Sequence, residues 1–213
     1  MGDIMNIGII GTGKMGGGLG RLWAGRGHAI VFGSRDPYKA IQLGESIGMM
    51  ATGATITKAA QFGDVILLAV PWVAVENALS LAGPLKGKIL IDCTNPMTPD
   101  YLRLLIGHES SGAEQIAACA RGAHVVKAFN YVYAEIIRSS PQFGAQNATV
   151  LYCGDDDPAK ETVAGLIADA GFDPVDAGPL QNARYLEPIA GQMMQLAYVL
   201  RVGTDQALKI IRR

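Results

Sequence analysis

Cysteine is scarce in this chain, and its spacing removes two classes of protein at the outset. The three cysteines, Cys93, Cys119 and Cys153, are odd in number, and none belongs to a C-x-x-C pair. A disulfide framework needs paired cysteines, and a thiolate metal site needs closely spaced ones. We therefore expect buried, unreactive thiols and no metal site.

Long apolar runs and clusters of one charge are also missing. No apolar run approaches the ~20 residues that a transmembrane helix requires. The first ten residues, MGDIMNIGII, carry an acid and lead directly into a predicted strand, unlike a secretion signal. The formal net charge is −1, and no Lys/Arg-rich run offers a surface for nucleic acid or an acidic membrane. These absences predict a cytoplasmic protein without a nucleic-acid or membrane partner.

The chain does have many apolar residues and many glycines. Of its 213 residues, 49% are hydrophobic, 17% are charged and 27 are glycine, a composition that favours an α/β domain with tight turns. Runs of about five apolar residues alternate with helix-like segments, as in β-α-β units around a parallel sheet. We therefore predict a Rossmann-type α/β fold with a doubly wound, mainly parallel sheet. Strands are expected near residues 5–10, 29–33, 64–69, 88–92, 124–128, 148–153 and 173–176.

The last part of the chain has a different pattern. From Asn182 to Arg213 the sequence is helical in character throughout, and the stretch LEPIAGQMMQLAYVL is unusually apolar. We expect residues 1–180 to form the domain and residues 181–213 to form a short C-terminal helical segment. That segment would pack on the domain or against a partner subunit, which predicts a homodimer.

A glycine-rich turn follows the first predicted strand. The stretch IGIIGTGKMG places Gly11, Gly13 and Gly16 as G-x-G-x-x-G between an apolar strand and an amphipathic helix. In this context the first glycine permits a tight turn, the second admits a pyrophosphate, and the third lets helix and strand pack closely. The helix N-terminus adds free N–H groups for the phosphates. The turn, including Thr12, Lys14 and Met15, is therefore predicted to bind a dinucleotide.

The tip of the second strand indicates which dinucleotide. Sites that prefer NAD place an acid there for the ribose 2′-hydroxyl, whereas the stretch VFGSRDPYK places Ser34 and Arg35 there. A hydroxyl and a guanidinium fork would bind a 2′-phosphate, which favours NADP(H). Lys39, one turn further, adds a second cation or is a solvated helix residue. Asp36 is the competing acid, but its position before Pro37 is explained by helix capping.

The loops after the next three strands are expected to line the nicotinamide, because ligands of open α/β sheets bind beyond the carboxyl ends of the strands. These loops read AVPW, DCTNP and KAFN. Trp72 would cover the dinucleotide or, alternatively, serve as a core or interface aromatic. The predicted contacts from these loops are Val70, Pro71, Trp72, Thr94, Asn95 and Pro96. Turn formation alone would also explain the Asn-Pro pair.

A proton donor for carbonyl reduction is hard to find. His28, His108 and His124 fall in turns, in a loop or at the amino end of a strand. Lys127 and Asn130 are the remaining candidates for a catalytic acid, and Lys127 has an equally good structural interpretation. Hydride transfer between two cofactor rings needs no such acid, because the rings carry the electronics and the protein holds them face to face.

Several motifs together resemble the coenzyme F420-dependent NADP oxidoreductases, which pass hydride between NADPH and a deazaflavin. They run in order as GTGKMGGGLGRLWAGRGHAIVFGSRDP, AVPW, YCGDDDPAK and DAGPLQNARYLEP, from Ile7 to about Glu187. The resemblance implies that NADP(H) is bound and that F420 or a flavin is the second substrate. It implies that the 2′-phosphate contacts are Thr12, Ser34, Arg35 and Lys39. It also places the deazaflavin cleft at the turn of Gly178, Pro179 and Leu180.

Three functions follow from these patterns. The first is an NADPH-dependent oxidoreductase that exchanges hydride with a small-molecule redox acceptor, a deazaflavin or a flavin. The second is a carbonyl or imine reductase of the β-hydroxyacid dehydrogenase or pyrroline-carboxylate reductase kind. Those families append a helical domain larger than the roughly 30 residues available here. The third is a non-catalytic NADPH-binding module.

Overall fold

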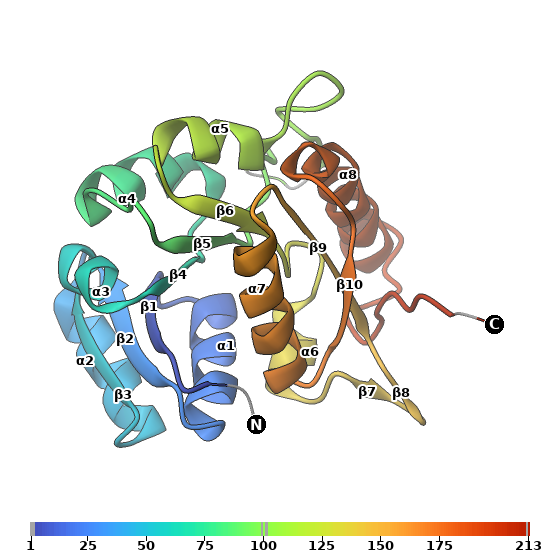
Figure 1. The fold of residues 1–213 in the computed structure, drawn as a ribbon. Coiled ribbons are helices and arrows are strands. Elements are labelled where there is room, and N and C mark those ends of the chain that lie inside the picture. Colours follow the sequence, from blue (N-terminus) through green and yellow to red (C-terminus); the bar gives the residue numbers. More distant parts are fainter. Residues whose placement is uncertain (1–2, 99, 101, 212) are drawn as a thin grey trace.

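The computed structural model describes residues 3–98, 100, 102–211 and 213. Its centre is an eight-stranded sheet in the order β10-β9-β6-β5-β4-β1-β2-β3 (Figure 1). All neighbouring strands are parallel except β6 and β9, which pair antiparallel. The strands are β1 (Asn6–Ile10), β2 (Ala29–Ser34), β3 (Ala51–Thr55), β4 (Val65–Leu68), β5 (Ile89–Asp92), β6 (His124–Lys127), β9 (Thr149–Gly154) and β10 (Asp173–Asp176). The predicted doubly wound, mainly parallel sheet is confirmed.

Helices cover both faces of the sheet, because its strands are apolar on both sides. Ile9 and Leu67 point into one buried cluster with helices α1 and α7, whereas Ile10 and Leu68 point into a second cluster with α3, α4 and α5. Parallel sheets buried on both faces have this continuous apolar character. The helices are α1 (Lys14–Gly25), α2 (Pro37–Ile47), α3 (Ile56–Phe62), α4 (Val75–Ala82), α5 (Gly112–Cys119), α6 (Ala134–Arg138), α7 (Asp157–Asp169) and α8 (Ala183–Met194).

Three further strands were not predicted. Strand β3 pairs with β2 at the sheet edge, and a small hairpin joins β7 (Gln142–Phe143) to β8 (Gln146–Asn147). Strand β3 carries few large apolar side chains. Its Gly53 instead lets helix α2 approach closely, since a Cβ there would lie 2.0 Å from the Ala40 carbonyl carbon. An apolar pattern cannot reveal a strand that packs in this way.

The C-terminal segment is helical only in its first part, so the prediction of helix through Arg213 is wrong. Helix α8 continues into a π-helical turn, Gln195–Val199, and residues 200–211 and 213 contain no helix. Arg201 and Gly203 have positive φ angles of 56° and 89°, which interrupt helical geometry. The chain then runs beside β9, where the Thr149 N–H donates to the Leu208 carbonyl at 2.8 Å. This backbone partner for β9 favours an extended tail over a helix.

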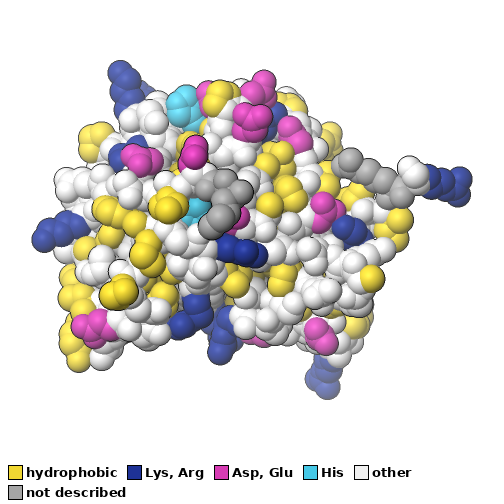
Figure 2. Space-filling model, turned by 60° about the horizontal axis from the view of Figure 1, so that its bottom comes forward, with side chains coloured by type: hydrophobic (Ala, Val, Ile, Leu, Met, Phe, Trp, Pro, Cys, Tyr) yellow, Lys and Arg dark blue, Asp and Glu magenta, His cyan; other side chains and the backbone are white. Residues whose placement is uncertain are grey.

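Helix α8 packs on the domain at α5. The Arg184 guanidinium donates to both carboxylate oxygens of Glu114, at 2.9 and 2.7 Å. Within the described residues, no helix has both the length and the apolar character of a transmembrane span. On the face drawn in Figure 2, basic and acidic side chains are interspersed among apolar ones.

Candidate functional site

The turn between β1 and α1 has the geometry predicted for the glycine motif. Gly11 has a φ of 121°, and a Cβ on Gly16 would lie 2.3 Å from the Gly11 carbonyl oxygen. Gly13 is the N-cap of α1, no side chain caps the helix, and the space where a Gly13 Cβ would stand is open. The first N–H groups of α1 therefore face open space, a suitable place for a phosphate.

The tip of β2 lies beside this turn, across a cleft of about 220 Å³ that we call the Arg35 cleft. The cleft joins the glycine turn to the end of β2 and the start of the loop after β4. Arg35 is exposed at its rim. The residues that line it are Gly11, Thr12, Gly13, Gly33, Ser34, Arg35, Ile56, Ala69, Val70, Pro71, Ala74, Asn77 and Ala78.

Asp36, the acid that competes with Arg35 in the sequence, caps helix α2. Its carboxylate accepts from the Tyr38 N–H at 3.2 Å, and its own N–H donates to Ser34 Oγ at 3.2 Å. The predicted cap is thereby confirmed. Asp36 is not among the described residues that line the Arg35 cleft, and neither is the exposed Lys39. A role for Lys39 at the 2′-phosphate stays a prediction.

A second cleft, of about 470 Å³, continues from the first, and we call it the Trp72 cleft. Gly13, Val70 and Pro71 line both clefts. The two therefore meet beyond the carboxyl ends of β1 and β4, where the strand order reverses and α/β sheets bind ligands. The lining residues are Gly13, Lys14, Met15, Ala69, Val70, Pro71, Trp72, Val73, Cys93, Thr94, Asn95, Met97, Thr98 and Met194.

The character of the Trp72 cleft is mostly apolar. Aliphatic, thioether and indole groups dominate its walls, and Lys14 is the only charged residue among the described lining. None of the three histidines belongs to the described lining of either cleft. His28 is buried, where its Nδ1 accepts from the Met5 N–H at 3.1 Å. The prediction that the histidines are poorly placed agrees with this arrangement.

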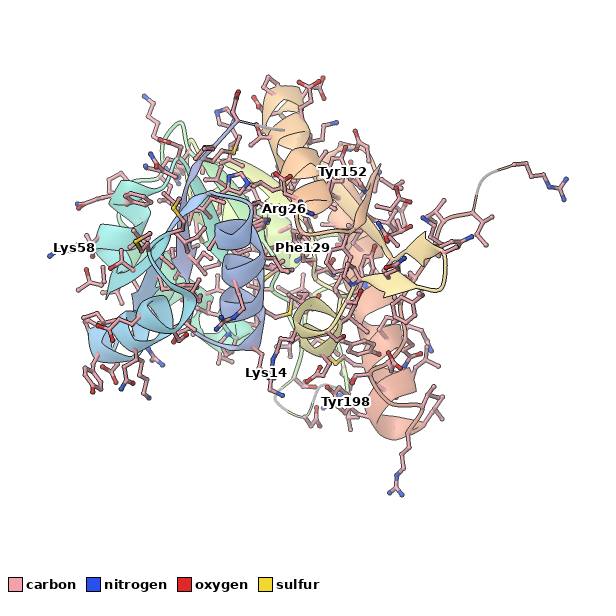
Figure 3. All side chains as sticks on the ribbon, turned by 90° about the horizontal axis from the view of Figure 1, so that it is seen from below. Lys14, Arg26, Lys58, Phe129, Tyr152 and Tyr198 are labelled. Carbon is pink, nitrogen blue, oxygen red and sulfur yellow. The ribbon has the colours of Figure 1, made fainter. Side chains whose placement is uncertain are left out.

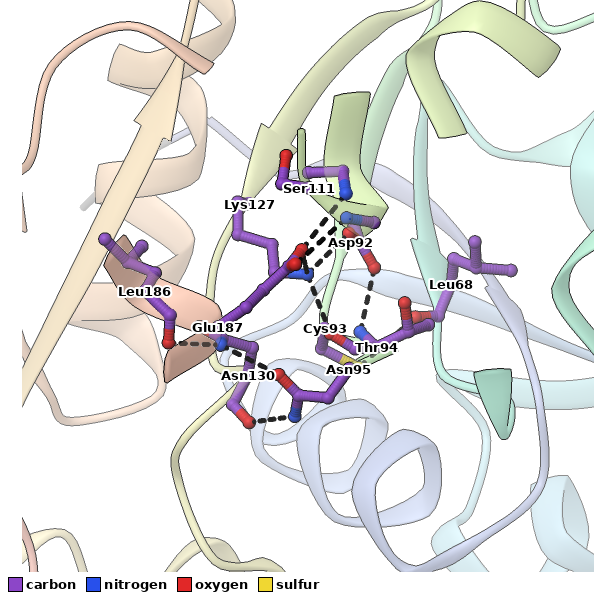
Figure 4. Close-up of polar contacts among 12 residues, drawn as sticks. Leu68, Asp92, Cys93, Thr94, Asn95, Ser111, Lys127, Asn130, Leu186 and Glu187 are labelled. Atoms are coloured by element: carbon purple, nitrogen blue, oxygen red, sulfur yellow. Dashed lines mark hydrogen bonds and ion pairs between the residues drawn. The ribbon is translucent and has the colours of Figure 1, made fainter. Parts of the chain in front are cut away.

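Lys127 is fully buried next to Thr94 of the Trp72 cleft, and Figure 4 shows its polar contacts. Its ammonium group donates to Asp92 Oδ2 at 2.8 Å, to the Thr94 carbonyl at 2.7 Å and to Glu187 Oε1 at 2.9 Å. A lysine has three N–H donors, and all three are used here, so none is left for a substrate. Burial alone would lower the pKa of Lys127, but Asp92 and Glu187 outweigh it and hold that pKa above its ordinary value. This geometry argues against Lys127 as a catalytic acid.

Asn130 is tied into the same region. Its side-chain amide donates to Asn95 Oδ1 at 3.0 Å and to the Leu186 carbonyl at 2.9 Å. Its own Oδ1 and Thr94 Oγ1 are buried and have no hydrogen-bond partner among the described residues. Thr94 lines the Trp72 cleft, whereas Pro96 is buried against Gly112 and lies outside the described lining.

The turn of Gly178, Pro179 and Leu180 follows β10 and leads into α8. Leu180 is buried, and its N–H donates to Asp155 Oδ1 at 2.8 Å. None of the three belongs to the described lining of the two clefts. Their assignment to an acceptor site stays a prediction.

The cysteines divide between core and surface. Burial raises the pKa of both Cys93 and Cys153 to about 12, so both are thiols at neutral pH. Cys119 is exposed, which corrects the expectation that all three are buried. It ends helix α5, whose other face packs on the sheet.

Several lining residues were not predicted from the sequence. Met97, Thr98 and Met194 belong to the Trp72 cleft, and Asn77 belongs to the Arg35 cleft. Cys93 also lines the Trp72 cleft, and only its loop, DCTNP, was predicted. Cys93 stands directly before the predicted Thr94 contact, so its place at a strand end was a usable signal. Met194 comes from α8, far along the chain, and no local pattern brings it to the cleft.

Comparisons with known proteins find two kinds of curated relative, and the first is the F420-dependent NADP reductases. The family described as "NADP oxidoreductase coenzyme F420-dependent" matches residues 6–96. The F420-dependent NADP reductase of Methanothermobacter thermautotrophicus is 31% identical over 209 residues, covering 91% of this chain and 89% of that protein. A crystal structure of an Arthrobacter protein assigned as an F420-dependent NADP reductase is 27% identical, with a TM-score of 0.88 over 98% of this chain and 100% of that one.

A second kind of relative is much longer. Metalloreductase STEAP3 of Rattus norvegicus is 36% identical over 183 residues, which cover 86% of this chain. The chain spans only 36% of the length of that metalloreductase.

Proposed function

The chain belongs to the coenzyme F420-dependent NADP oxidoreductases, and we propose that it transfers a hydride between NADP(H) and an acceptor with a deazaflavin (coenzyme F420) or flavin ring. The observation that carries this proposal is the pair of adjoining clefts at the switch point of the sheet. The Arg35 cleft has the chemistry for a phosphorylated ribose. The Trp72 cleft has the chemistry for stacked, uncharged rings.

The nucleotide would lie across both clefts. The helix N-terminus at Gly13 would hold the pyrophosphate, and Thr12, Ser34 and Arg35 would hold the 2′-phosphate. A guanidinium fork binds phosphate through two charge-assisted hydrogen bonds, whereas a carboxylate at that place would repel it. The carboxylate of Asp36 should not repel the 2′-phosphate, because it accepts a hydrogen bond from the N-terminus of α2.

The nicotinamide would lie in the Trp72 cleft, where it supplies or receives the hydride. Thr94 offers the buried hydroxyl that has no partner in the described part of the chain, and a polar group bound in the cleft would satisfy it. Val70 and Pro71 would orient the ring from the loop after β4. The apolar walls would exclude water from the transfer.

The scarcity of free proton donors in the described lining favours transfer between two rings over reduction of a carbonyl. Carbonyl reduction produces an alkoxide that needs a proton from a nearby acid. Lys14, the only charged group in the described lining of the Trp72 cleft, is paired with Glu135 at 3.1 Å. Lys127 donates its three N–H groups to Asp92, Thr94 and Glu187. Transfer between rings requires only that both be held face to face.

We further propose that the protein works as a homodimer in the cytoplasm. Exposed apolar side chains at the end of the α8 segment support the homodimer. Tyr198, Val199 and Leu200 there are 58%, 48% and 64% exposed. A monomer by light scattering at micromolar concentration would contradict this part of the proposal.

The test of function is a turnover assay with a panel of acceptors. Protein is mixed with NADPH and with F420, FMN or a series of carbonyl and imine compounds, and loss of the NADPH absorbance band is followed. We expect rapid oxidation with a ring acceptor and none with the carbonyl and imine series. Oxidation by carbonyl or imine compounds alone would support the small-molecule reductase, and tight binding without turnover would support a binding module.

A further inference from the structure

A third cavity, of about 500 Å³, lies beside the glycine turn and is lined by α1, α2 and α6; we call it the α1–α6 groove. It shares Thr12 with the Arg35 cleft, Lys14 with the Trp72 cleft and Gly13 with both. Figure 3 shows Lys14, the first residue of α1, with its side chain extended beside α6. The lining residues are Thr12, Gly13, Lys14, Gly17, Gly18, Arg21, Leu22, Leu43, Ile137 and Arg138.

The spacing of residues on α1 explains the shape of this groove. Lys14 and Arg21 are two turns apart and so lie on the same face of α1. The positions between them on that face are Gly17 and Gly18, which have no side chains. The missing side chains let α6 come close, since a Cβ on Gly18 would lie 2.7 Å from Ile137 Cγ2. A shallow channel therefore runs along α1 from one cation to the other.

The groove is positively charged in a chain whose net charge is −1. It has three cations in its described lining and no acid. Glu135 contacts it from α6, where it pairs with Lys14 at 3.1 Å. Hydrogen bonding to its own backbone N–H and to Lys14 lowers the pKa of Glu135, so this carboxylate is charged and offsets one cation. The other two cations form no ion pair with the described residues.

Those two are Arg21 and Arg138. Arg21 donates to the Ser46 carbonyl and to Ser46 Oγ, both at 3.3 Å, which occupies two of its five N–H donors. Arg138 is exposed and has no hydrogen bond or ion pair to the described residues. Both guanidinium groups can therefore still bind an anion, and guanidinium groups suit phosphate esters.

From this arrangement we propose that the α1–α6 groove binds the anionic side chain of the acceptor while the acceptor ring lies in the Trp72 cleft. The ligand chemistry is a phosphate ester carried on the ring's side chain, as in FMN or in a deazaflavin phosphodiester. The inference rests on the proposed function, because it assumes that the Trp72 cleft takes the acceptor ring. Lys14 connects the two sites, since it lines both.

The test compares ring acceptors with and without the anionic group. Binding of FMN and riboflavin is measured by quenching of flavin fluorescence, and kcat/KM is measured with NADPH. The same comparison is made for F420 and its chromophore without the phosphate tail. We expect the wild type to favour the charged member of a pair by about tenfold. The pair with the larger preference identifies which acceptor side chain the groove binds, that of FMN or that of F420.

Substitutions then test whether the arginines of the α1–α6 groove cause the preference for the phosphorylated acceptor. Arg138→Gln should weaken FMN by about tenfold and leave riboflavin within about twofold. Arg21→Gln should act in the same direction. The control is Arg121→Gln, an exposed arginine in the turn before the amino end of β6, whereas the clefts lie beyond the carboxyl ends of β1 and β4. The control should keep the wild-type preference.

Three results would overturn the inference: a wild type that binds both members of each pair equally, an Arg138→Gln variant that weakens both equally, or a control that loses the preference too. A rise in the KM for NADPH with Arg138→Gln and riboflavin would also overturn it, because the groove would then serve the dinucleotide. Preferential binding of the phosphorylated member of a pair, without NADPH oxidation by either FMN or F420, would support the groove and refute the proposed function, so the two failures are distinguishable.

Discussion

Replacing Lys127 with methionine would test whether the buried charges beside the cleft hold the structure together. Methionine keeps most of the side-chain volume and removes the charge. Asp92 and Glu187, exposed by 0% and 1%, would then be buried carboxylates without their cation. Breaking a buried ion pair by removing one partner costs about 3–5 kcal/mol.

The remaining hydrogen bonds place the expected cost of this change near the lower end of that range. Glu187 would still accept from the N–H groups of Gly112 and Ala113, at 2.9 and 3.1 Å. Asp92 would still accept from the Thr94 N–H at 2.8 Å. We therefore expect Lys127→Met to lower the free energy of unfolding by about 3 kcal/mol.

Urea unfolding followed by circular dichroism measures this loss, provided that the slope with denaturant is unchanged. Lys58→Met, at an exposed position of α3, is the matched control and should stay within about 0.5 kcal/mol of wild type. The double variant Lys127→Met with Glu187→Gln should be more stable than Lys127→Met alone, because it removes one of the stranded charges. A loss below about 1 kcal/mol for Lys127→Met would refute the reasoning.

Three shorter predictions concern the cap, the pH dependence and the aromatic wall. Asp36→Ala should cost about 1 kcal/mol in urea unfolding, because α2 loses its N-cap, and should not improve NADH binding. Since the folded-state pKa of Lys127 is raised, its stabilising effect should be complete below the unfolded-state pKa of about 10.4 and should decline as the pH rises from there through the folded-state pKa. The Lys127→Met variant should lack that decline in alkaline unfolding experiments. Trp72→Ala should lower kcat/KM about tenfold with any ring acceptor, and an unchanged value would remove Trp72 from the acceptor site.

The parts of the fold that the sequence predicted correctly are those with a local cause. Gly11, Gly13 and Gly16 act within one turn, and Asp36 caps the helix that begins at the next residue. The central strands were predictable because their apolar runs are continuous. Strand β3 was missed because its packing depends on a close approach at Gly53, which leaves little apolar signal.

The parts that could not be predicted depend on contacts between distant segments. Lys127 meets Asp92 and Glu187 across 35 and 60 residues of chain, so only the fold reveals that its three protons are used. Met194 reaches the Trp72 cleft from α8 in the same way. The sequence pattern of the tail after Val199 predicted a helix. In the structure the tail instead runs beside β9 and accepts a hydrogen bond from the Thr149 N–H.

The most direct test of the central claim is the affinity of Arg35→Asp for NADPH and for NADH, measured by titration of intrinsic fluorescence. The variant removes a charge-assisted fork and adds repulsion at the rim of the Arg35 cleft. We expect NADPH binding to weaken by roughly 2–4 kcal/mol, about 30- to 1,000-fold, while NADH changes little. Arg121→Asp, with the same change of charge before the amino end of β6, should leave both affinities near wild type. Equal losses for NADPH and NADH in Arg35→Asp would contradict the account.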